Sequence, residues 1–264
     1  MNLELIGKTV FITGSTAGIG FATAKTLVKE GASVILNGRT KEKVEVAVKS
    51  LQKEFPESKV SGIVANFLNV EEISALLETL PAIDILVNNV GIYTSGDFFK
   101  STDADWQQQF EVNVMSGVRL SKQLLPKMIG NNWGRILFVS SECATLVPTD
   151  MIAYSMTKAA ILAVSRGLAQ LTKGTGVTVN TIVPGSTLSE GAAKFLEKAA
   201  KEESKSKTQI EEEFFTQKRT SSLLQRFASV EEIANTITYL VSPLSSATNG
   251  SVIKADGGSM GGIL

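Results

Sequence analysis

A tyrosine and a lysine four residues apart could together move a proton. Tyr154 and Lys158 fall in a stretch whose apolar pattern predicts a helix over 151–173, so they share one helical face. A free tyrosine has a pKa of about 10, but a neighbouring ammonium group favours the phenolate and lowers that pKa. Tyr154 is therefore predicted to act as a general acid or base on a carbonyl or an alcohol.

A serine lies just beyond a predicted strand, upstream of this pair. Ser141 follows the apolar run 135–140, and its hydroxyl could hold the same carbonyl oxygen. Taken singly, a serine after a strand and a Tyr-x-x-x-Lys pair are ordinary features. Their order within one doubly wound domain favours a shared site, because the crevice of such a sheet lies at the carboxyl ends of its strands.

Histidine is absent from the sequence, and this absence excludes several classes of site. No Ser–His–Asp triad, Cys–His dyad or His-ligated zinc site can be built, and we predict no metal. Cys143 is the only cysteine, so an intrachain disulfide is impossible and a reducing compartment is expected.

Charge and hydropathy argue against two kinds of partner. The 264 residues include 26 Lys and Arg and 26 Asp and Glu, and a net charge of zero disfavours a nucleic-acid binder. The first residues do not match a signal peptide, and no apolar run is long enough to cross a bilayer. We therefore expect a cytoplasmic protein that binds neither nucleic acid nor membrane.

A glycine-rich turn between the first predicted strand and the first helix is typical of pyrophosphate binding. Gly14, Gly18 and Gly20 have the spacing Gly-x-x-x-Gly-x-Gly. Small residues let the backbone approach the phosphates, and the helix N-terminus offers free N–H groups. The same glycines could merely permit a tight turn, but their place after the first strand favours a dinucleotide site. The residues predicted to bind there are Gly14, Ser15, Thr16, Gly18, Ile19 and Gly20.

The end of the second predicted strand bears on the choice of dinucleotide. NAD sites usually place a carboxylate there, whereas this chain reads Asn37-Gly38-Arg39-Thr40. Gly38 leaves room, and Arg39 offers a fork of donors suited to a 2′-phosphate. NADP(H) is predicted over NAD(H), although an arginine at a strand end could also be an ordinary surface residue.

Short apolar strands alternate with helical stretches along the whole chain. Strands are expected at 8–13, 33–37, 59–64, 83–88, 135–140, 177–183 and 251–254, and helices at 18–30, 41–54, 70–80, 103–129, 151–173 and 230–241. Continuous apolar strands of this kind predict a parallel sheet covered on both faces. The predicted architecture is α/β, a Rossmann-type doubly wound sheet of about seven strands in a single domain over 1–264.

Together these motifs resemble those of the short-chain dehydrogenase/reductase family over nearly the whole chain. The matching segments are Thr13-Gly14-x-x-x-Gly18-Ile19-Gly20, Asn88-Asn89-Val90-Gly91, Val112-Asn113-Val114, Ser141, Tyr154-x-x-x-Lys158, Pro184-Gly185 and Asp256-Gly257-Gly258. The resemblance implies an NAD(P)-dependent oxidoreductase that transfers a hydride between the nicotinamide cofactor and a carbonyl or alcohol substrate. In such an enzyme Tyr154 would be the general acid and base.

The resemblance also implies roles for particular residues. Lys158 would tune Tyr154 and bind the nicotinamide ribose, Ser141 would orient the carbonyl, and Asn113 would hold a water in a proton relay. Asn66 stands where many members have an Asp that contacts the adenine. The other residues implied at the cofactor are Asn88, Gly91, Pro184, Gly185 and Thr187.

Two further positions depart from the family pattern. Val90 replaces the usual Ala, which adds bulk near the cofactor without charge. Ala17 stands where many NADP-preferring members have a basic residue, so Arg39 carries the NADP prediction nearly alone.

The segment at about 186–224 corresponds to the family's variable substrate loop. Its mixed charges over 190–220 indicate a solvated helical face. Phe195, Leu196, Ile210, Phe214 and Phe215 could pack such helices together as a lid over the substrate.

The sequence leaves the substrate and part of the function open. A 3-oxoacyl thioester, a small ketone, a sugar and a polyol are all allowed. A non-catalytic dinucleotide-binding sensor or scaffold is the alternative function, and the intact set of Asn113, Ser141, Tyr154 and Lys158 argues against it. The family resemblance also implies a homo-oligomer, either a tetramer or a dimer.

Overall fold

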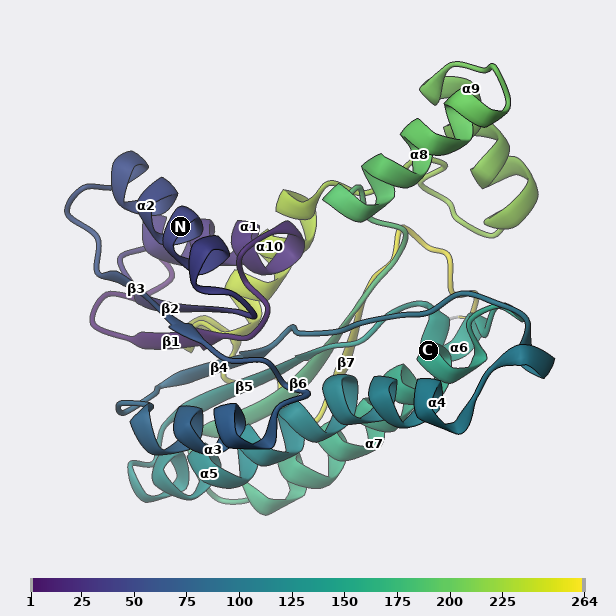
Figure 1. Ribbon diagram of the computed structural model, residues 1–264. Coiled ribbons are helices and arrows are strands. Elements are labelled where there is room, and N and C mark those ends of the chain that lie inside the picture. The colour runs from purple at the N-terminus through teal and green to yellow at the C-terminus, as the bar shows by residue number, and fades with distance from the viewer. Residues whose placement is uncertain (1, 263–264) are drawn as a thin grey trace.

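The computed structural model describes residues 2–262, in which seven strands form one parallel sheet (Figure 1). The strand order is β3-β2-β1-β4-β5-β6-β7, so the winding direction reverses between β1 and β4. Their bounds are β1 Thr9–Ile12, β2 Ser33–Gly38, β3 Val60–Val64, β4 Ile85–Asn88, β5 Gly134–Val139, β6 Val177–Pro184 and β7 Val252–Ala255. Ligands of such sheets bind at the carboxyl ends of the strands near this reversal.

Helices cover both faces of the sheet (Figure 1). One layer contains α1 (Gly18–Lys29), α2 (Lys41–Glu54) and α10 (Val230–Leu240), and the opposite layer contains α3 (Val70–Thr79), α4 (Asp103–Phe110), α5 (Ser116–Gly130) and α7 (Ile152–Leu171). The remaining short elements are η1 Phe98–Lys100, η2 Glu111–Met115, α6 Cys143–Leu146 and η4 Pro243–Ser245. No helix of residues 2–262 has both the length and the apolar character that a membrane span requires.

Alternating side chains of the central strands fill a core on each side of the sheet. Val10 and Ile12 pack with the first helical layer, while Phe11 between them packs with the second, and all three are fully buried. This two-residue period is what a strand buried on both faces requires. The predicted α/β doubly wound fold is therefore confirmed.

The helical stretch predicted over 103–129 is confirmed, but it is not a regular α-helix throughout. The chain runs from α4 to α5 without a break through η2, a π-helical turn at Glu111–Met115. The apolar pattern continues across all three segments and carries no sign of the wider turn. Asn113 lies within this π turn, and its side chain forms hydrogen bonds to residues outside the helix.

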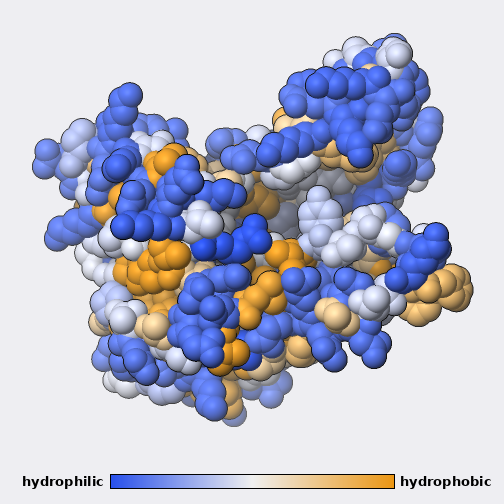
Figure 2. All heavy atoms as spheres, viewed as in Figure 1, coloured by the Kyte–Doolittle hydropathy of each residue, from blue (hydrophilic) through white to orange (hydrophobic). Residues whose placement is uncertain are grey.

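A helical projection stands off the sheet beyond the carboxyl ends of the strands (Figure 1). It consists of α8 (Glu190–Glu202), α9 (Lys207–Glu213) and the π-helical turn η3 (Phe214–Lys218). Leu196, Ile210, Phe215 and Phe227 form a small separate core, against which Phe214 packs, whereas Phe195 is 47% exposed. The outer surface of the projection is mostly hydrophilic in Figure 2, in agreement with the predicted solvated face.

Candidate active site

The turn between β1 and α1 offers bare backbone at the carboxyl ends of the strands. Gly14 and Gly18 have φ values of +60° and +57°, a conformation that favours glycine. A Cβ atom on Gly20 would lie 2.5 Å from Nδ2 of Asn89, so only glycine fits there. Ala17 caps α1 without a side-chain hydrogen bond, and the first turn contains no acid. The first N–H groups of α1 are therefore left for an anionic ligand.

Two asparagines hold this turn in shape without any charge. Asn37 accepts the Gly14 amide at 3.0 Å through Oδ1 and donates from Nδ2 to two carbonyl groups at the end of β3. Asn89 donates from Nδ2 to the carbonyls of Thr13 and Gly14, at 2.9 Å each. Sequence reasoning assigned neither side chain this role, because the bonds join segments that lie far apart in the chain.

Two side chains of this turn that were predicted at the cofactor, those of Ser15 and Ile19, do not line the cavity in front of it. Ser15 is fully buried, and its hydroxyl donates to the carbonyl of Ile12 at 2.7 Å and accepts the amide of Asn37 at 3.0 Å. Ile19 packs against the core on the α1 side of the sheet. Both residues build the turn, and any contact of theirs with a cofactor stays a prediction.

A cavity of about 380 Å³ extends from the turn along the end of β2. Thr16, Arg39, Lys43 and Asn66 contribute side chains to it, and no Asp or Glu is among its lining residues. A Cβ atom on Gly38 would lie 2.6 Å from Cγ2 of Thr16, so glycine keeps this edge open. Within residues 2–262 neither Arg39 nor Lys43 forms an ion pair with a carboxylate, which leaves both cations available to an anion. Lys43 was missed from the sequence, although it lies four residues after Arg39, in the first turn of α2.

Three residues predicted as one site come together beyond β5. The Ser141 hydroxyl lies close enough to the Tyr154 phenol to lower the pKa of that phenol, and Nζ of Lys158 lies 5.5 Å from the centre of the Tyr154 ring. The same Nζ donates to the carbonyl of Val139 at 2.9 Å. A Cβ atom on Gly91 would lie 3.3 Å from Nζ, so the glycine lets the loop after β4 approach the lysine closely.

Burial dominates the protonation of this cluster. It raises the pKa of Tyr154 well above its ordinary value, and nearby Cys143 adds to the rise while the hydrogen bond from Ser141 opposes it. Burial likewise lowers the pKa of Lys158 to about 8. The expectation that Lys158 lowers the pKa of Tyr154 is therefore not met in this structure. The physical reason is that partial burial of the phenol disfavours its charged form, while the ammonium is directed to the carbonyl of Val139.

Asn113 lies in the π turn η2 and clamps the neighbouring loop. Its Nδ2 donates to the Ile92 carbonyl at 2.8 Å and to Oγ1 of Thr157 at 2.9 Å, and its Oδ1 accepts the Ile92 amide at 2.8 Å. Thr157 directly precedes Lys158, so the clamp joins the loop after β4 to α7. The water relay implied for Asn113 stays a prediction, while its positioning of the loop is an additional role.

The remaining predicted residues lie at the ends of β4 and β6. Gly185 follows β6 so close to β7 that a Cβ atom would lie 2.5 Å from the Asp256 carbonyl oxygen. Pro184 ends β6, and Thr187 donates from Oγ1 to the Gly185 carbonyl at 2.9 Å. Asn88 is buried at the end of β4, and within the described residues its side-chain amide has no hydrogen-bond partner.

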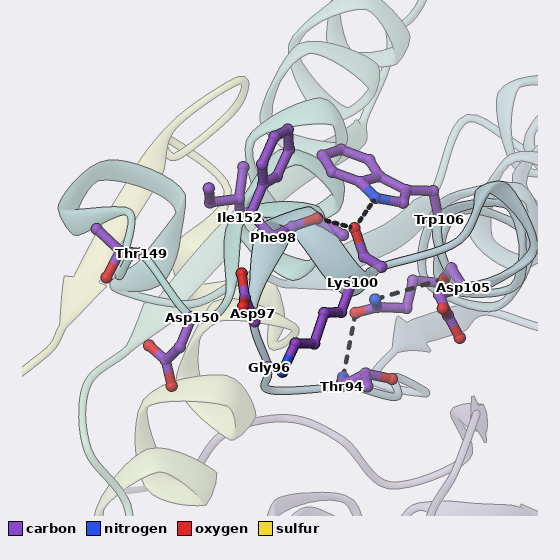
Figure 3. Close-up of a pocket in the computed structure, with 13 residues that line it drawn as sticks. Thr94, Gly96, Asp97, Phe98, Lys100, Asp105, Trp106, Thr149, Asp150 and Ile152 are labelled. Carbon is purple, nitrogen blue, oxygen red and sulfur yellow. Dashed lines mark hydrogen bonds between the residues drawn. The ribbon is translucent and has the colours of Figure 1, made fainter.

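A second hollow near the site was not predicted from the sequence. Figure 3 shows it between residues 94–106 and 149–153, with the rings of Phe98 and Trp106 close together on one wall. Its volume is about 170 Å³, and Tyr154 is not among its lining residues. We therefore treat it as separate from the Ser141–Tyr154–Lys158 cluster.

Comparison with known proteins agrees with this geometry. Residues 8–200 match the short chain dehydrogenase family. An uncharacterized oxidoreductase of Bacillus subtilis, YvrD, is 45% identical over 98% of both chains, and the 3-oxoacyl-[acyl-carrier-protein] reductase FabG of Aquifex aeolicus is 32% identical over 98% of this chain and 99% of its own. The crystal structure of L-sorbose reductase from Gluconobacter frateurii, complexed with NADPH and L-sorbose, superposes with a TM-score of 0.93 at 30% identity over the whole of both chains.

The match covers the segments that build the phosphate turn and the Ser141–Tyr154–Lys158 cluster. The two curated relatives extend the likeness to nearly the full length of the chain. The chain is therefore a member of the short-chain dehydrogenase/reductase family of oxidoreductases.

Proposed function

We propose that the protein is an NADP(H)-dependent oxidoreductase that interconverts a carbonyl and an alcohol. The carrying observation is the partly buried phenol of Tyr154, which lies beside Ser141 and one helical turn from the buried Lys158. A raised pKa keeps this phenol protonated at neutral pH, as a donor of a proton to a carbonyl must be. Carbonyl reduction is accordingly the proposed direction at neutral pH.

The residues along the β1–α1 turn and the end of β2 fit a phosphorylated dinucleotide. The uncapped first turn of α1 would take the pyrophosphate, and Arg39 with Lys43 would take the 2′-phosphate. The absence of Asp and Glu from the cavity lining favours NADP(H) over NAD(H), because the 2′-phosphate would meet no like charge there. The NADPH complex of L-sorbose reductase supports the same choice by similarity.

The chain's own residues would donate the proton and orient the substrate. When bound, the nicotinamide group supplies or takes up the hydride. The Ser141 hydroxyl would hold the substrate oxygen, and Oη of Tyr154 would give that oxygen its proton. Lys158, mostly protonated below a pKa of about 8, would stabilise the phenolate that is left behind.

The substrate class follows from chemistry and similarity together. A small ketone, a sugar and a 3-oxoacyl thioester all present a carbonyl to this site, and the relatives named above include reductases of the last two kinds. We further propose that residues at about 186–224 close over the substrate. Assembly as a tetramer or dimer and a cytoplasmic location remain predictions, of which light scattering tests the first.

Tyr154→Phe tests the function most directly. Without the phenolic proton, kcat for ketone reduction should fall by about a hundredfold or more, while NADPH still binds. Turnover is followed by NADPH absorbance over a panel of ketones, sugars and 3-oxoacyl thioesters, and NADPH binding by fluorescence titration. Tyr239→Phe makes the same chemical change at a surface position, 44% exposed, and should be silent.

The same variant separates this proposal from a non-catalytic sensor or scaffold. A sensor would bind NADPH with wild-type affinity in both forms and reduce no compound of the panel. Full activity of the Tyr154→Phe protein would rule out the phenol as the proton donor.

A further inference from the structure

One buried carboxylate directly follows Ser141 and has no role in the chemistry proposed above. Glu142 is 3% exposed. Its Oε1 accepts a hydrogen bond from Oγ of Ser186 at 2.9 Å and from Nε of Arg219 at 3.0 Å. Ser186 comes just after β6, where the chain leaves for α8, and Arg219 comes directly after η3. A single oxygen atom therefore ties together both ends of the helical projection.

The backbone around Glu142 is held independently of this carboxylate. The amide of Glu142 donates to the Pro184 carbonyl at 2.9 Å, and its carbonyl accepts the amide of Thr145 at 3.1 Å. Oγ of Ser141 accepts the Cys143 amide at 3.2 Å. The loop after β5 thus has its own hydrogen bonds, so the carboxylate is not needed to fold it.

The ion pair is also a costly arrangement if stability were its only role. Both partners are largely removed from water, with side-chain exposures of 4% for Glu142 and 18% for Arg219. Oε2 of Glu142 is buried and has no hydrogen-bond partner within residues 2–262. Buried pairs of this kind contribute little net stability compared with apolar residues, but they fix which groups meet. The other ion pairs of the projection, such as Lys207–Glu197, are exposed.

We propose that Glu142 is a positioning residue that fastens residues 186–219 beside Ser141. Closure of the projection and alignment of the Ser141 hydroxyl would then occur together, since adjacent residues of one short loop carry both. The kinetic part of this inference rests on the proposed reductase function, whereas the structural part does not.

The structural part is tested by hydrogen–deuterium exchange of the intact protein. Glu142→Gln keeps the size of the side chain and an acceptor for Ser186 but removes the charge that binds Arg219. We expect the amides of α8 and α9 to exchange about tenfold faster in this variant. Glu197→Gln makes the same change in an exposed pair of the projection and should leave exchange unaltered.

A double-mutant cycle with Arg219→Gln tests whether the two side chains act through one another. If they do, the amides of α8 and α9 exchange no faster in the double variant than in either single variant. The coupling energy between the two side chains then accounts for most of the lost protection. With a reducible ketone, KM should rise about tenfold while the Kd of NADPH stays within about twofold, since the dinucleotide cavity is not touched. A merely structural defect would weaken both.

Unchanged exchange in α8 and α9, or additive losses in the cycle, would overturn the inference. Should Glu142→Gln not fold, the same exchange measurement on Arg219→Gln is the test, and faster exchange of α8 and α9 is again the expected result. Should no ketone be reduced by the wild type, the proposed function fails, but the exchange results still decide whether Glu142 fastens the projection.

Discussion

The dinucleotide side of the molecule and the helical projection are built by different means. The β1–α1 turn is held by neutral amide side chains, above all Asn37 and Asn89, that bond to backbone within the sheet. The projection has a small core of its own, and exposed ion pairs link its residues to one another. The first region can be preorganised for one unchanging ligand, whereas the second can move while keeping its internal structure. Variants that act on only one region should make this contrast visible.

The largest expected effect is on the projection alone. Phe215 is 1% exposed within its separate core, so Phe215→Ala should destabilise the projection by about 3–5 kcal/mol. The main unfolding transition of the sheet and the Kd of NADPH should change little. Hydrogen exchange resolved by peptide checks this, with Phe195→Ala, at a 47% exposed position of α8, as the matched control. Loss of NADPH binding would show that the two regions are not separable.

The next effect concerns the buried ammonium of Lys158. Because its pKa in the folded protein, about 8, lies below the ordinary value of 10.5, folding costs free energy while the group is charged in both states. Lys158→Met should therefore raise the free energy of unfolding by roughly 3 kcal/mol at pH 7, less the loss of the bond to Val139. This gain in the free energy of unfolding should shrink as the pH rises from 8 to 10.5. In that range Lys158 of the wild type loses its proton on folding, so the folded protein no longer buries a charge.

Denaturant unfolding at pH 7 and pH 10 measures this difference. Lys122→Met, on the exposed face of α5, is the control and should show no such pH dependence. A Lys158→Met protein less stable than the wild type at pH 7 would mean that the buried charge is compensated within the fold.

Two glycine substitutions sharpen the comparison from the dinucleotide side. Gly20→Ala places a Cβ atom 2.5 Å from Nδ2 of Asn89 and 2.7 Å from the Gly14 carbonyl oxygen, two atoms that are hydrogen-bonded to each other. We expect a loss of about 1–3 kcal/mol and weaker NADPH binding. Gly167→Ala in α7 meets nothing within 4 Å and should instead stabilise by about 0.5–1 kcal/mol. Thermal melts with and without NADPH decide between these outcomes.

The smallest expected effect is on the choice of dinucleotide. Arg39→Ala should weaken NADPH binding by about tenfold and leave NADH binding unchanged, because only the 2′-phosphate loses a partner. Fluorescence titration with both dinucleotides measures it, and Lys49→Ala on the exposed side of α2 controls for a lost surface charge. Equal affinity of the wild type for NADH and NADPH would contradict the NADP(H) assignment.

The sequence was most informative where a pattern is local. Strand positions followed from apolar runs, and the Tyr154–Lys158 spacing placed both residues on one turn of α7 because helical geometry fixes neighbours four residues apart. The turn at Gly14 to Gly20 was predicted for the same reason, since it joins one strand to the next helix.

Contacts between distant segments were beyond prediction. The partners Glu142 and Arg219 lie 77 residues apart, and no periodicity relates them. The direction of the Tyr154 pKa was also missed, because it depends on how far the folded chain buries the phenol. The π turn was missed because the helical pattern of the sequence continues from α4 through η2 into α5.

That π turn has a consequence for how this stretch of chain can vary. A turn that contains one surplus residue sets α4 and α5 about 100° out of rotational phase. Deleting a residue between Glu111 and Met115 would restore an ordinary α-helix. It would also rotate α4 about the helix axis relative to α5. Asn113 would then lose either Ile92 or Thr157. Insertions and deletions should thus be rejected here even where single substitutions are accepted, which makes length, more than composition, the inherited property of this segment.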